Sequence, residues 1–326
     1  MWRLLSGLFA ALLVGGAAIL GYARWPLHPG DHVYHLPPGT TMRAFADKLH
    51  AQHVIGAVDP FLALARLTGN SNALQAGDYR LDDPTTPWKI LNQVVEGHVV
   101  QYAVTLVPGW TFQQVRQALH GKHLRDNIAG LSNGAVMAML GHPHVSAEGA
   151  FFPDTYFYTN AATATSILRR AYRRMHTLLM ADWQKRAQDL PVVNPEQALI
   201  LASLVERETA EDGERRKIAG VFVNRLRLHM PLQTDPTVIF GLGPRYQGVL
   251  TTSDLAVKSP YNTYLHVGLP PTPIALPSAR TLYAAMHPSK TRALYFVATG
   301  LGGHVFSTTL QQQDREIIKY ELHGHP

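Results

Sequence analysis

Apolar and polar positions divide the chain into one uncharged amino-terminal run and two longer regions with mixed periodicity. The run covers residues 4–22, close to the roughly 20 apolar residues that a helix needs to cross a bilayer. An arginine stands on each side of it, and Trp25, which follows, suits a membrane interface. The pattern predicts a cytoplasmic tip and a single transmembrane helix over residues 1–25.

A cleaved secretory signal is the alternative interpretation of this run. Signals of that kind have an apolar core of about 7–15 residues and end at a small-x-small site. The run here is longer, and residues 20–24 make a poor cleavage site, so an uncleaved anchor is favoured. The later uncharged stretches 127–147 and 259–279 are interrupted by polar residues and proline. Residues 26–326 are therefore expected on one side of the membrane.

Residues 26–105 have the pattern of a short linker and a small α+β module. Apolar spacing and turn residues predict three helices and three strands, the helices at 42–50, 60–67 and 86–95 and the strands at 32–36, 76–81 and 99–106. By itself this order indicates a small domain with an ordinary core and assigns no ligand to it.

Residues 106–326 are predicted to form a larger mixed α+β domain, so the fold class is α+β. Helical spacing appears at 111–119 and at 164–185, and residues 293–309 predict a hairpin around a glycine-rich turn. The longer helix carries four arginines between residues 169 and 174, a pattern more typical of a solvated helix face than of a nucleic-acid site.

Composition narrows the possible chemistry. The chain has no cysteine, which excludes a disulfide scaffold, a thiolate nucleophile, a cysteine-ligated zinc site and an iron–sulfur cluster. Its histidines lack a third ligand at metal spacing, so neither a metal nor a cofactor is expected. The formal charge of +6 permits an acidic partner. Nucleic acid is not expected, because of the anchor and because basic residues are not interleaved with aromatic ones.

A buried helix that ends in charge is the most informative feature of the sequence. Asn194 is a good helix cap, and residues 198–205 are apolar on all sides, which is typical of a helix buried in a core. Glu206 and Glu208 follow, and two residues advance a helix by about 200°. At most one of the two carboxylates can therefore line a given cleft, and the other is expected to meet solvent or to pair with an arginine such as Arg207 or Arg215.

A carboxyl at the end of a buried helix is partly desolvated, which raises its pKa. A raised pKa suits a general acid that protonates a glycosidic oxygen. Thr209 is expected to hydrogen-bond and orient the neighbouring carboxyl, although a plain solvated helix end is the alternative. A second helix is predicted over 214–227, and residues 234–236 (Thr-Asp-Pro) predict a turn after it.

The sequence resembles the YceG-like family of endolytic murein transglycosylases over nearly its whole length. The resemblance rests on LASLVERETA at 201–210, LQTDPTVIFGLG at 232–243, YNTY at 261–264 and EGAFFPDTYFY at 148–158. LPPGT at 36–40 and LQAGDYRL at 74–81 resemble the LysM-like module of that family. The resemblance implies cleavage of the MurNAc–GlcNAc bond in nascent glycan strands. It also implies 1,6-anhydroMurNAc ends, formed without consuming water.

The resemblance also implies roles for individual residues. Glu208 matches the essential glutamate of the family, acting first as acid and then as base. Gln233, Asp235, Tyr261 and Asn262 are expected to bind substrate or to steady the site, and possible accessory residues are Glu206, Asp154 and Asn224. A hydrolase would need a second carboxyl at roughly 5–9.5 Å, for which Asp235 and Asp154 are the candidates.

The expected partners are peptidoglycan glycan strands, the membrane and cell-wall synthases such as penicillin-binding proteins. The expected location is the inner (cytoplasmic) membrane, with the catalytic part on the periplasmic side. Two alternatives to a lytic transglycosylase remain: a hydrolytic muramidase acting on the same substrate, and a non-catalytic peptidoglycan-binding scaffold for the synthases.

Overall fold

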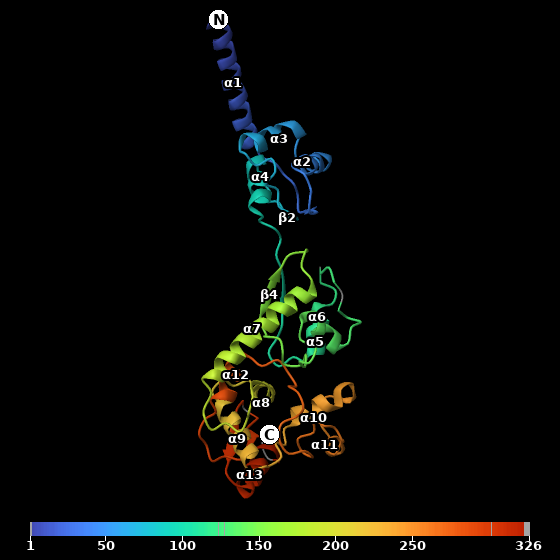
Figure 1. Cartoon of the computed structure of the whole chain (residues 1–326), viewed down its shortest axis with the longest axis vertical. Coiled ribbons are helices and arrows are strands. Elements are labelled where there is room, and N and C mark those ends of the chain that lie inside the picture. The colour runs from blue at the N-terminus through green and yellow to red at the C-terminus, as the bar shows by residue number, and fades with distance from the viewer. Residues whose placement is uncertain (1, 123, 127, 301, 323–326) are drawn as a thin grey trace. The chain divides into compact units, whose positions relative to one another are not determined.

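The chain folds into two compact units in this computed structural model, which describes residues 2–122, 124–126, 128–300 and 302–322 (Figure 1). Unit 1 comprises residues 1–103 with 157–162, and unit 2 comprises residues 104–156 with 163–326. Both contain helices and short strands, and their sheets are two-stranded, so the α+β class predicted from the sequence is correct.

The amino-terminal run lies in helix α1 (Trp2–Ala23). Within the part of the chain that the structure describes, no helix is both long and apolar enough to cross a membrane. The transmembrane span is therefore not found in the structure and stays a prediction from the sequence.

Unit 1 is built on an antiparallel pair of strands, β1 (Val33–Leu36) and β2 (Gly77–Arg80), whose register pairs Tyr34 with Tyr79. Three helices pack with them, α2 (Met42–Ala51), α3 (Val58–Leu67) and α4 (Pro87–Glu96). The hydroxyls of Thr41 and Thr86 accept hydrogen bonds from the first turns of α2 and α4, as expected of N-caps. These elements lie where apolar spacing predicted them.

Unit 2 contains most of the helices and all or part of four strands. The elements up to the site are β3 (Tyr102–Thr105), which starts in unit 1, α5 (Phe112–Leu119), α6 (Asn133–Leu140), β4 (Thr155–Tyr158), α7 (Ala164–Gln184), α8 (Pro195–Glu208) and α9 (Arg215–Arg227). They are followed by α10 (Asp235–Leu242), a 3-10 turn (Gly243–Arg245), α11 (Thr252–Leu255), α12 (Ala279–Met286), β5 (Tyr295–Ala298), β6 (His304–Ser307), α13 (Leu310–Ile317) and a π-helical turn (Ile318–Leu322).

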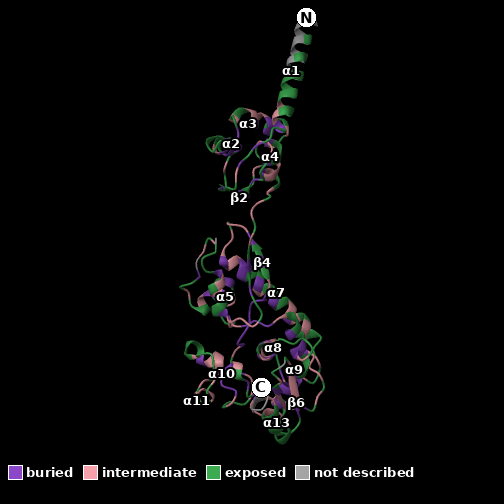
Figure 2. Ribbon diagram, turned by 180° about the vertical axis from the view of Figure 1, so that it is seen from behind, coloured by how far each residue is buried: buried purple, intermediate pink, exposed green. Residues whose placement is uncertain are grey.

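The core of unit 2 forms around α8, which packs against α7, α9 and α12. Residues 198–205 of α8 are all buried, and α9 has a buried run of its own over residues 218–223; buried residues are purple in Figure 2. On α9, a Cβ at Gly220 would lie 2.5 Å from the carbonyl oxygen of Ser289, so only glycine allows that approach. The hairpin of β5 and β6 is antiparallel, as predicted, and pairs Phe296 with Phe306.

The structure differs from the sequence-based expectation at one point close to the site. Asp235 and Pro236 begin helix α10, whereas Thr-Asp-Pro predicted a turn. Proline is favoured in the first turn of a helix because its missing N–H would have no helical partner there. The same dipeptide therefore fits either a turn or a helix start, and only the apolar run that follows distinguishes them.

Candidate active site

Helix α8 delivers two carboxylates to opposite sides of its carboxyl end. The helix starts where Asn194 accepts a hydrogen bond from the amide of Gln197, with Pro195 in the first turn. It ends at Glu208, because Thr209 has an extended backbone conformation. The structure confirms the predicted divergence, since Glu206 and Glu208 have different partners.

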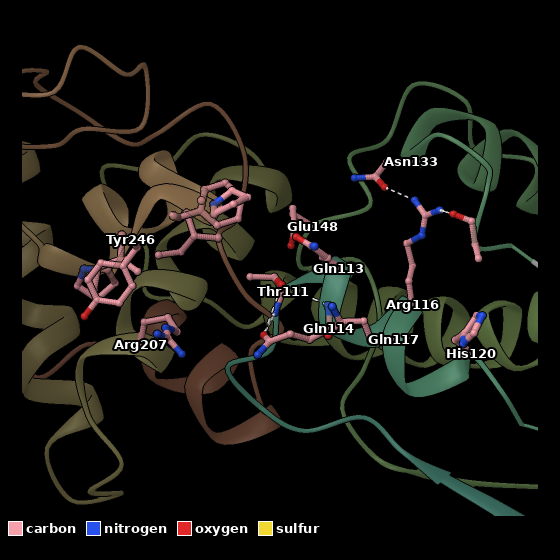
Figure 3. A pocket seen from close by; sticks show the side chains of 17 residues that line it. Thr111, Gln113, Gln114, Arg116, Gln117, His120, Asn133, Glu148, Arg207 and Tyr246 are labelled. Carbon is pink, nitrogen blue, oxygen red and sulfur yellow. Dashed lines mark hydrogen bonds between the residues drawn. The ribbon is translucent and has the colours of Figure 1, made fainter. Parts of the chain in front are cut away.

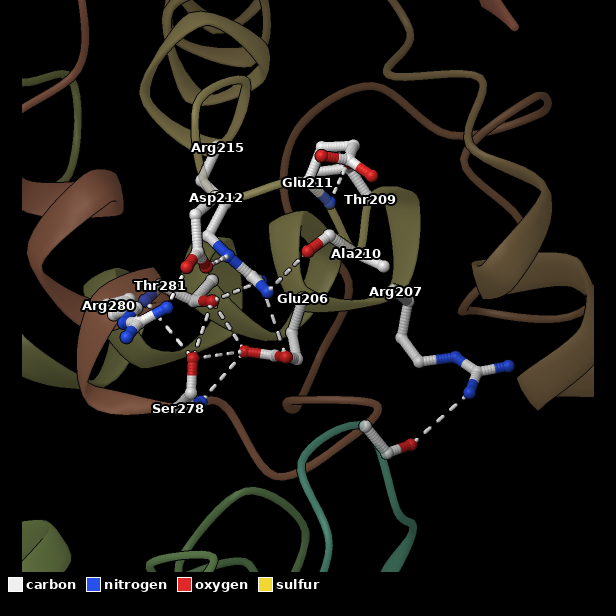
Figure 4. Close-up of polar contacts among 11 residues, drawn as sticks. Glu206, Arg207, Thr209, Ala210, Glu211, Asp212, Arg215, Ser278, Arg280 and Thr281 are labelled. Carbon is white, nitrogen blue, oxygen red and sulfur yellow. Dashed lines mark hydrogen bonds and ion pairs between the residues drawn. The ribbon is translucent and has the colours of Figure 1, made fainter. Parts of the chain in front are cut away.

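Glu206 belongs to a buried polar network that joins α8, α9 and α12 (Figure 4). Its Oε2 accepts hydrogen bonds from the amide and hydroxyl of Ser278, both at 2.8 Å, and from the hydroxyl of Thr281. Its Oε1 lies 3.3 Å from Nη1 of Arg215, and the side chain is only 6% exposed. Both oxygens are thus occupied, and Glu206 has a structural role as the anion at the amino terminus of α12.

Glu208 lies on the other side of the helix and is half-buried. The hydroxyl of Thr234 donates a hydrogen bond to its Oε1. Burial raises the pKa of this carboxyl to about 7, helped by the nearby charge of Asp235, while the Thr234 bond and the charges of Arg225 and Arg207 act in the opposite direction. A carboxyl in this state is partly protonated near neutral pH, as a general acid requires.

Thr209 does not orient Glu208, contrary to the expectation from sequence. Its hydroxyl accepts a hydrogen bond from the amide of Glu211 and so caps the turn after α8. The orienting hydroxyl comes instead from Thr234, which is 26 positions farther along the chain. No local pattern in the sequence predicts this contact.

The segment before α10 is fixed by a buried arginine. Arg225 donates to the carbonyls of Pro231 (3.2 Å) and Leu232 (2.8 Å) and to Oε1 of Gln233 (3.3 Å). Gln233 itself has a φ of 48°, a left-handed conformation that is uncommon outside glycine. The residue is exposed, so the part of its side chain that Arg225 does not hold remains available for the predicted contact with substrate.

Three threonines join this segment to the 261–264 loop. The hydroxyl of Thr263 accepts a hydrogen bond from the amide of Thr234 and lies 2.9 Å from the hydroxyl of Thr237. The carbonyl of Thr263 accepts a further bond from the amide of Gln233. All three threonines are buried, so the position of the Thr234 hydroxyl is set on several sides.

Asp235 is the acidic group whose charge acts on Glu208 from the start of α10. Its Oδ1 accepts a hydrogen bond of 2.6 Å from the hydroxyl of Tyr264. Burial and the bond to Asp235 raise the pKa of Tyr264, so this hydroxyl stays protonated and continues to donate. Asp235 is exposed, and the structure brings it together with Glu208, Thr234 and Tyr264.

Tyr261 and Asn262 differ in their availability to a ligand. Tyr261 is half-buried, with its ring against Phe240 and its hydroxyl 3.0 Å from that of Thr272. Asn262 is completely buried. Its Nδ2 donates to the carbonyls of Leu255 and Val257, both at 2.9 Å, and its Oδ1 accepts from an amide of the same loop. Of the two roles expected of Asn262, these contacts fit steadying the loop and leave no exposed amide for the substrate.

Asn224 and Asp154 also have structural partners. The Nδ2 of Asn224 donates to the carbonyls of Thr291 and Ala293, which fixes the chain before β5. Oδ2 of Asp154 forms an ion pair of 2.8 Å with Arg174 on α7. The contacts of Asp154 do not include Glu208 among the described residues, so Asp235 is the better-placed candidate for a second carboxylate.

A pocket of about 960 Å³, lined by both polar and apolar groups, adjoins these residues (Figure 3). Arg207 and Pro236, the chain neighbours of Glu208 and Asp235, are part of its lining. Side-chain amides and aromatic rings supply much of the rest, among them Gln113, Gln114, Gln117, Asn133, Phe240 and Tyr246. Rings that stack on sugar faces and amides that bond hydroxyls suit a carbohydrate.

Glu148 is a further titratable group of this pocket that the sequence did not single out. Its Oε2 accepts a hydrogen bond of 2.9 Å from the amide of Phe112, at the start of α5. Burial raises the pKa of this carboxyl to about 7, against the effect of that hydrogen bond. The only sequence signal was its position at the start of the 148–158 segment. In the described part of the chain, no three acidic, histidine or cysteine side chains lie close enough together to hold a metal ion.

Comparisons with known proteins identify the family. The chain is 30% identical to an endolytic murein transglycosylase of Bacillus subtilis, over 95% of this chain and 91% of that protein. It is 26% identical to one of Streptococcus pneumoniae, of which it spans only 57%. A crystal structure of a yceG-like protein from Listeria monocytogenes superposes with a TM-score of 0.57 at 26% identity, covering 87% of this chain and 98% of that one.

The profile of the YceG-like family matches residues 34–319, and the chain belongs to this family. The match includes all of the residues described above around Glu208, from Glu148 to Tyr264.

Proposed function

We propose that this protein is an endolytic peptidoglycan lytic transglycosylase that cleaves the MurNAc–GlcNAc bond with Glu208 as its single acid and base. The observation that carries the proposal is the half-buried Glu208 carboxyl, whose pKa is raised to about 7 and whose Oε1 is held by Thr234. Membership of the YceG-like family and the activity named for the relatives support it.

The proposed reaction proceeds in two steps. The protonated Glu208 first donates its proton to the glycosidic oxygen as the bond from that oxygen to C1 of MurNAc breaks. The resulting carboxylate then takes the proton of the muramyl 6-hydroxyl, whose oxygen bonds to C1 and closes the 1,6-anhydro ring. One carboxyl suffices, because the proton given up in the first step is recovered in the second, and no water is consumed.

The geometry around Glu208 supports its use first as an acid and then as a base. Thr234 occupies Oε1, which leaves Oε2 for the substrate oxygen. Asp235 stabilises the protonated form before the first step, and Arg225 and Arg207 favour the carboxylate that this step produces. The opposing charges hold the pKa near the working pH, where one group can give and regain a proton most readily.

A hydrolytic muramidase is the second candidate function, and Asp235 is the observation that favours it. Asp235 is exposed and its charge acts on Glu208, so it could activate a water molecule. Its Oδ1 is however engaged by Tyr264, whose own pKa is raised. The one-carboxylate route is the better supported of the two, because it needs no further base.

We also propose that the uncharged run 4–22 anchors the protein in the inner membrane, with units 1 and 2 on the periplasmic side. This rests on the length and flanking residues of the run alone. Unit 1 is proposed to contain the LysM-like module, and cell-wall synthases are the proposed partners. Extraction of cell membranes with alkaline carbonate tests the anchor, since a protein with a spanning helix stays in the membrane pellet.

The assignment of the acid is tested with purified protein and uncrosslinked glycan strands, with strand length and ends analysed by mass spectrometry. Wild type is expected to shorten the strands and to leave anhydro ends, and Glu208→Gln to leave the strands intact. Glu206→Gln is expected to retain cleavage when folded, which circular dichroism checks. Cleavage by Glu208→Gln together with loss in a folded Glu206→Gln would overturn the assignment. Binding of strands without any cleavage by wild type would favour the scaffold.

A further inference from the structure

Two arginines line the pocket beside Glu208, and they differ in the number of hydrogen bonds that they make. Arg116 on α5 donates to Oδ1 of Asn133 at 3.1 Å and to the carbonyls of Ile128 and Ala129. These bonds hold the chain between α5 and α6. Arg116 is therefore part of the wall of the pocket.

Arg207 is exposed and makes few contacts. Among the described residues, its guanidinium makes one hydrogen bond, to the carbonyl oxygen of Gly109 at 3.3 Å. A guanidinium has five N–H donors, arranged to bind a carboxylate through two parallel hydrogen bonds. Figure 4 shows the side chain directed away from the Glu206 network. Most of its donors are thus available to a ligand in the pocket.

Arg207 also precedes Glu208 in the chain and lies about 100° around the helix from it. The charge of Arg207 also acts on the Glu208 carboxyl, so a group bound to Arg207 would lie near that carboxyl. The acidic side chain that lines this pocket, Glu148, has its pKa raised to about 7 by burial, so it repels an anion little under mildly acidic conditions.

The substrate of the proposed function has only one kind of anion near the scissile bond. The sugar rings of a murein strand are uncharged, and their hydroxyl and acetamido groups do not require an arginine. Each muramyl residue carries a lactyl group, which either ends in a free carboxylate or continues into a stem peptide that bears carboxylates. Building on the proposed function, we propose that Arg207 binds a carboxylate carried by the muramyl residue that is cleaved.

The test compares three preparations of uncrosslinked strands of equal length. One carries stem peptides with free carboxylates, one carries the same peptides with these carboxylates converted to methylamides, and one has no peptides and exposes lactyl carboxylates. The kcat/KM for cleavage is measured for the wild type, for Arg207→Gln and for a control, Arg66→Gln. Arg66 is exposed on α3 in unit 1, so the control removes the same charge elsewhere.

Wild type should prefer at least one carboxylate-bearing strand over the methylamide strand by about 10- to 100-fold, the range expected of one charged hydrogen-bonded pair. Arg207→Gln should reduce that ratio to nearly one, and Arg66→Gln should keep it. A preference for the peptide carboxylates alone identifies the stem peptide as the ligand. A preference for the peptide-free strand alone identifies the lactyl carboxylate.

Equal cleavage of all three strands by wild type would overturn the proposal, as would an unchanged ratio in Arg207→Gln. If that variant shifts only the pH profile, Arg207 acts on the Glu208 carboxyl alone. If the wild type cuts none of the strands, the proposed function fails, and this result is distinct from a failure of the carboxylate site at Arg207. The preference is then measured from the Kd of each strand for Glu208→Gln, and equal Kd values would still refute the carboxylate site.

Discussion

Replacing Glu208 with glutamine should abolish cleavage and at the same time stabilise unit 2 at alkaline pH. The pKa of Glu208 is about 7 in the folded protein against about 4.5 for an exposed glutamate, so between these values the folded state binds more protons than the unfolded state. Stability therefore falls as the pH rises through this window. Linkage gives a cost of about 1 kcal/mol at pH 5 and about 3 kcal/mol at pH 8.

Glutamine carries no charge at either pH, so Glu208→Gln avoids this cost. Its free energy of unfolding should exceed that of wild type by about 2 kcal/mol more at pH 8 than at pH 5. The contribution of Glu148 is present in both proteins and cancels. Glu196→Gln, at an exposed position in the first turn of the same helix, is the matched control, for which no such pH-dependent gain is expected.

The assay is urea unfolding at the two pH values, followed by pulsed hydrogen exchange on peptides from α8 and α9. This readout follows unit 2 without the signal of unit 1. A difference between wild type and Glu208→Gln that is the same at pH 5 and pH 8 would refute the reasoning. It would mean that the carboxyl is solvated and has an ordinary pKa, and the argument for a poised acid would fall with it.

Three further predictions concern neighbouring groups. Cleavage by wild type should decline as the pH rises through about 7. Thr234→Val loses the hydrogen bond that favours ionised Glu208, so it should shift this decline to higher pH and lower the maximal rate about tenfold. Thr234→Ser should do neither, and an unmoved pH profile in the valine variant would count against the contact. Glu206→Gln should lower the stability of unit 2 by about 3 kcal/mol, because Arg215 loses a buried partner. Thermal unfolding measures this loss, and a loss no larger than that of Glu211→Gln, at an exposed position, would argue against the network. Asn262→Ala should cost about 2 kcal/mol in the same assay and raise KM through the altered loop, whereas unchanged stability would return Asn262 to the substrate-binding residues.

Features that depend on short stretches of sequence could be predicted. Helix α8 has a cap, a proline and an apolar run within a few residues of one another, and its bounds followed from them. The divergence of Glu206 and Glu208 followed from helix geometry alone. The helix at 235–242 was missed, because Asp-Pro fits both a turn and a helix start and its apolar residues show no polar face.

Contacts between distant segments could not be predicted in the same way. Whether Glu206 or Glu208 pairs with Arg215 depends on how α9 and α12 dock on α8. Thr234 reaches Glu208 only because buried threonines and Arg225 fix its segment. A polar loop such as 261–264 has the same composition whether its asparagine meets a sugar or its own backbone, so the burial of Asn262 required the structure.

The central claim is that one carboxyl cleaves the glycan without water, and isotope labelling tests it most directly. Wild type is incubated with glycan strands in water enriched in oxygen-18, and the new ends are analysed by mass spectrometry. The account predicts 1,6-anhydro ends that contain no solvent oxygen and are absent with Glu208→Gln. Reducing ends that carry one labelled oxygen would contradict it and would assign the reaction to a hydrolase, with Asp235 as the first group to examine.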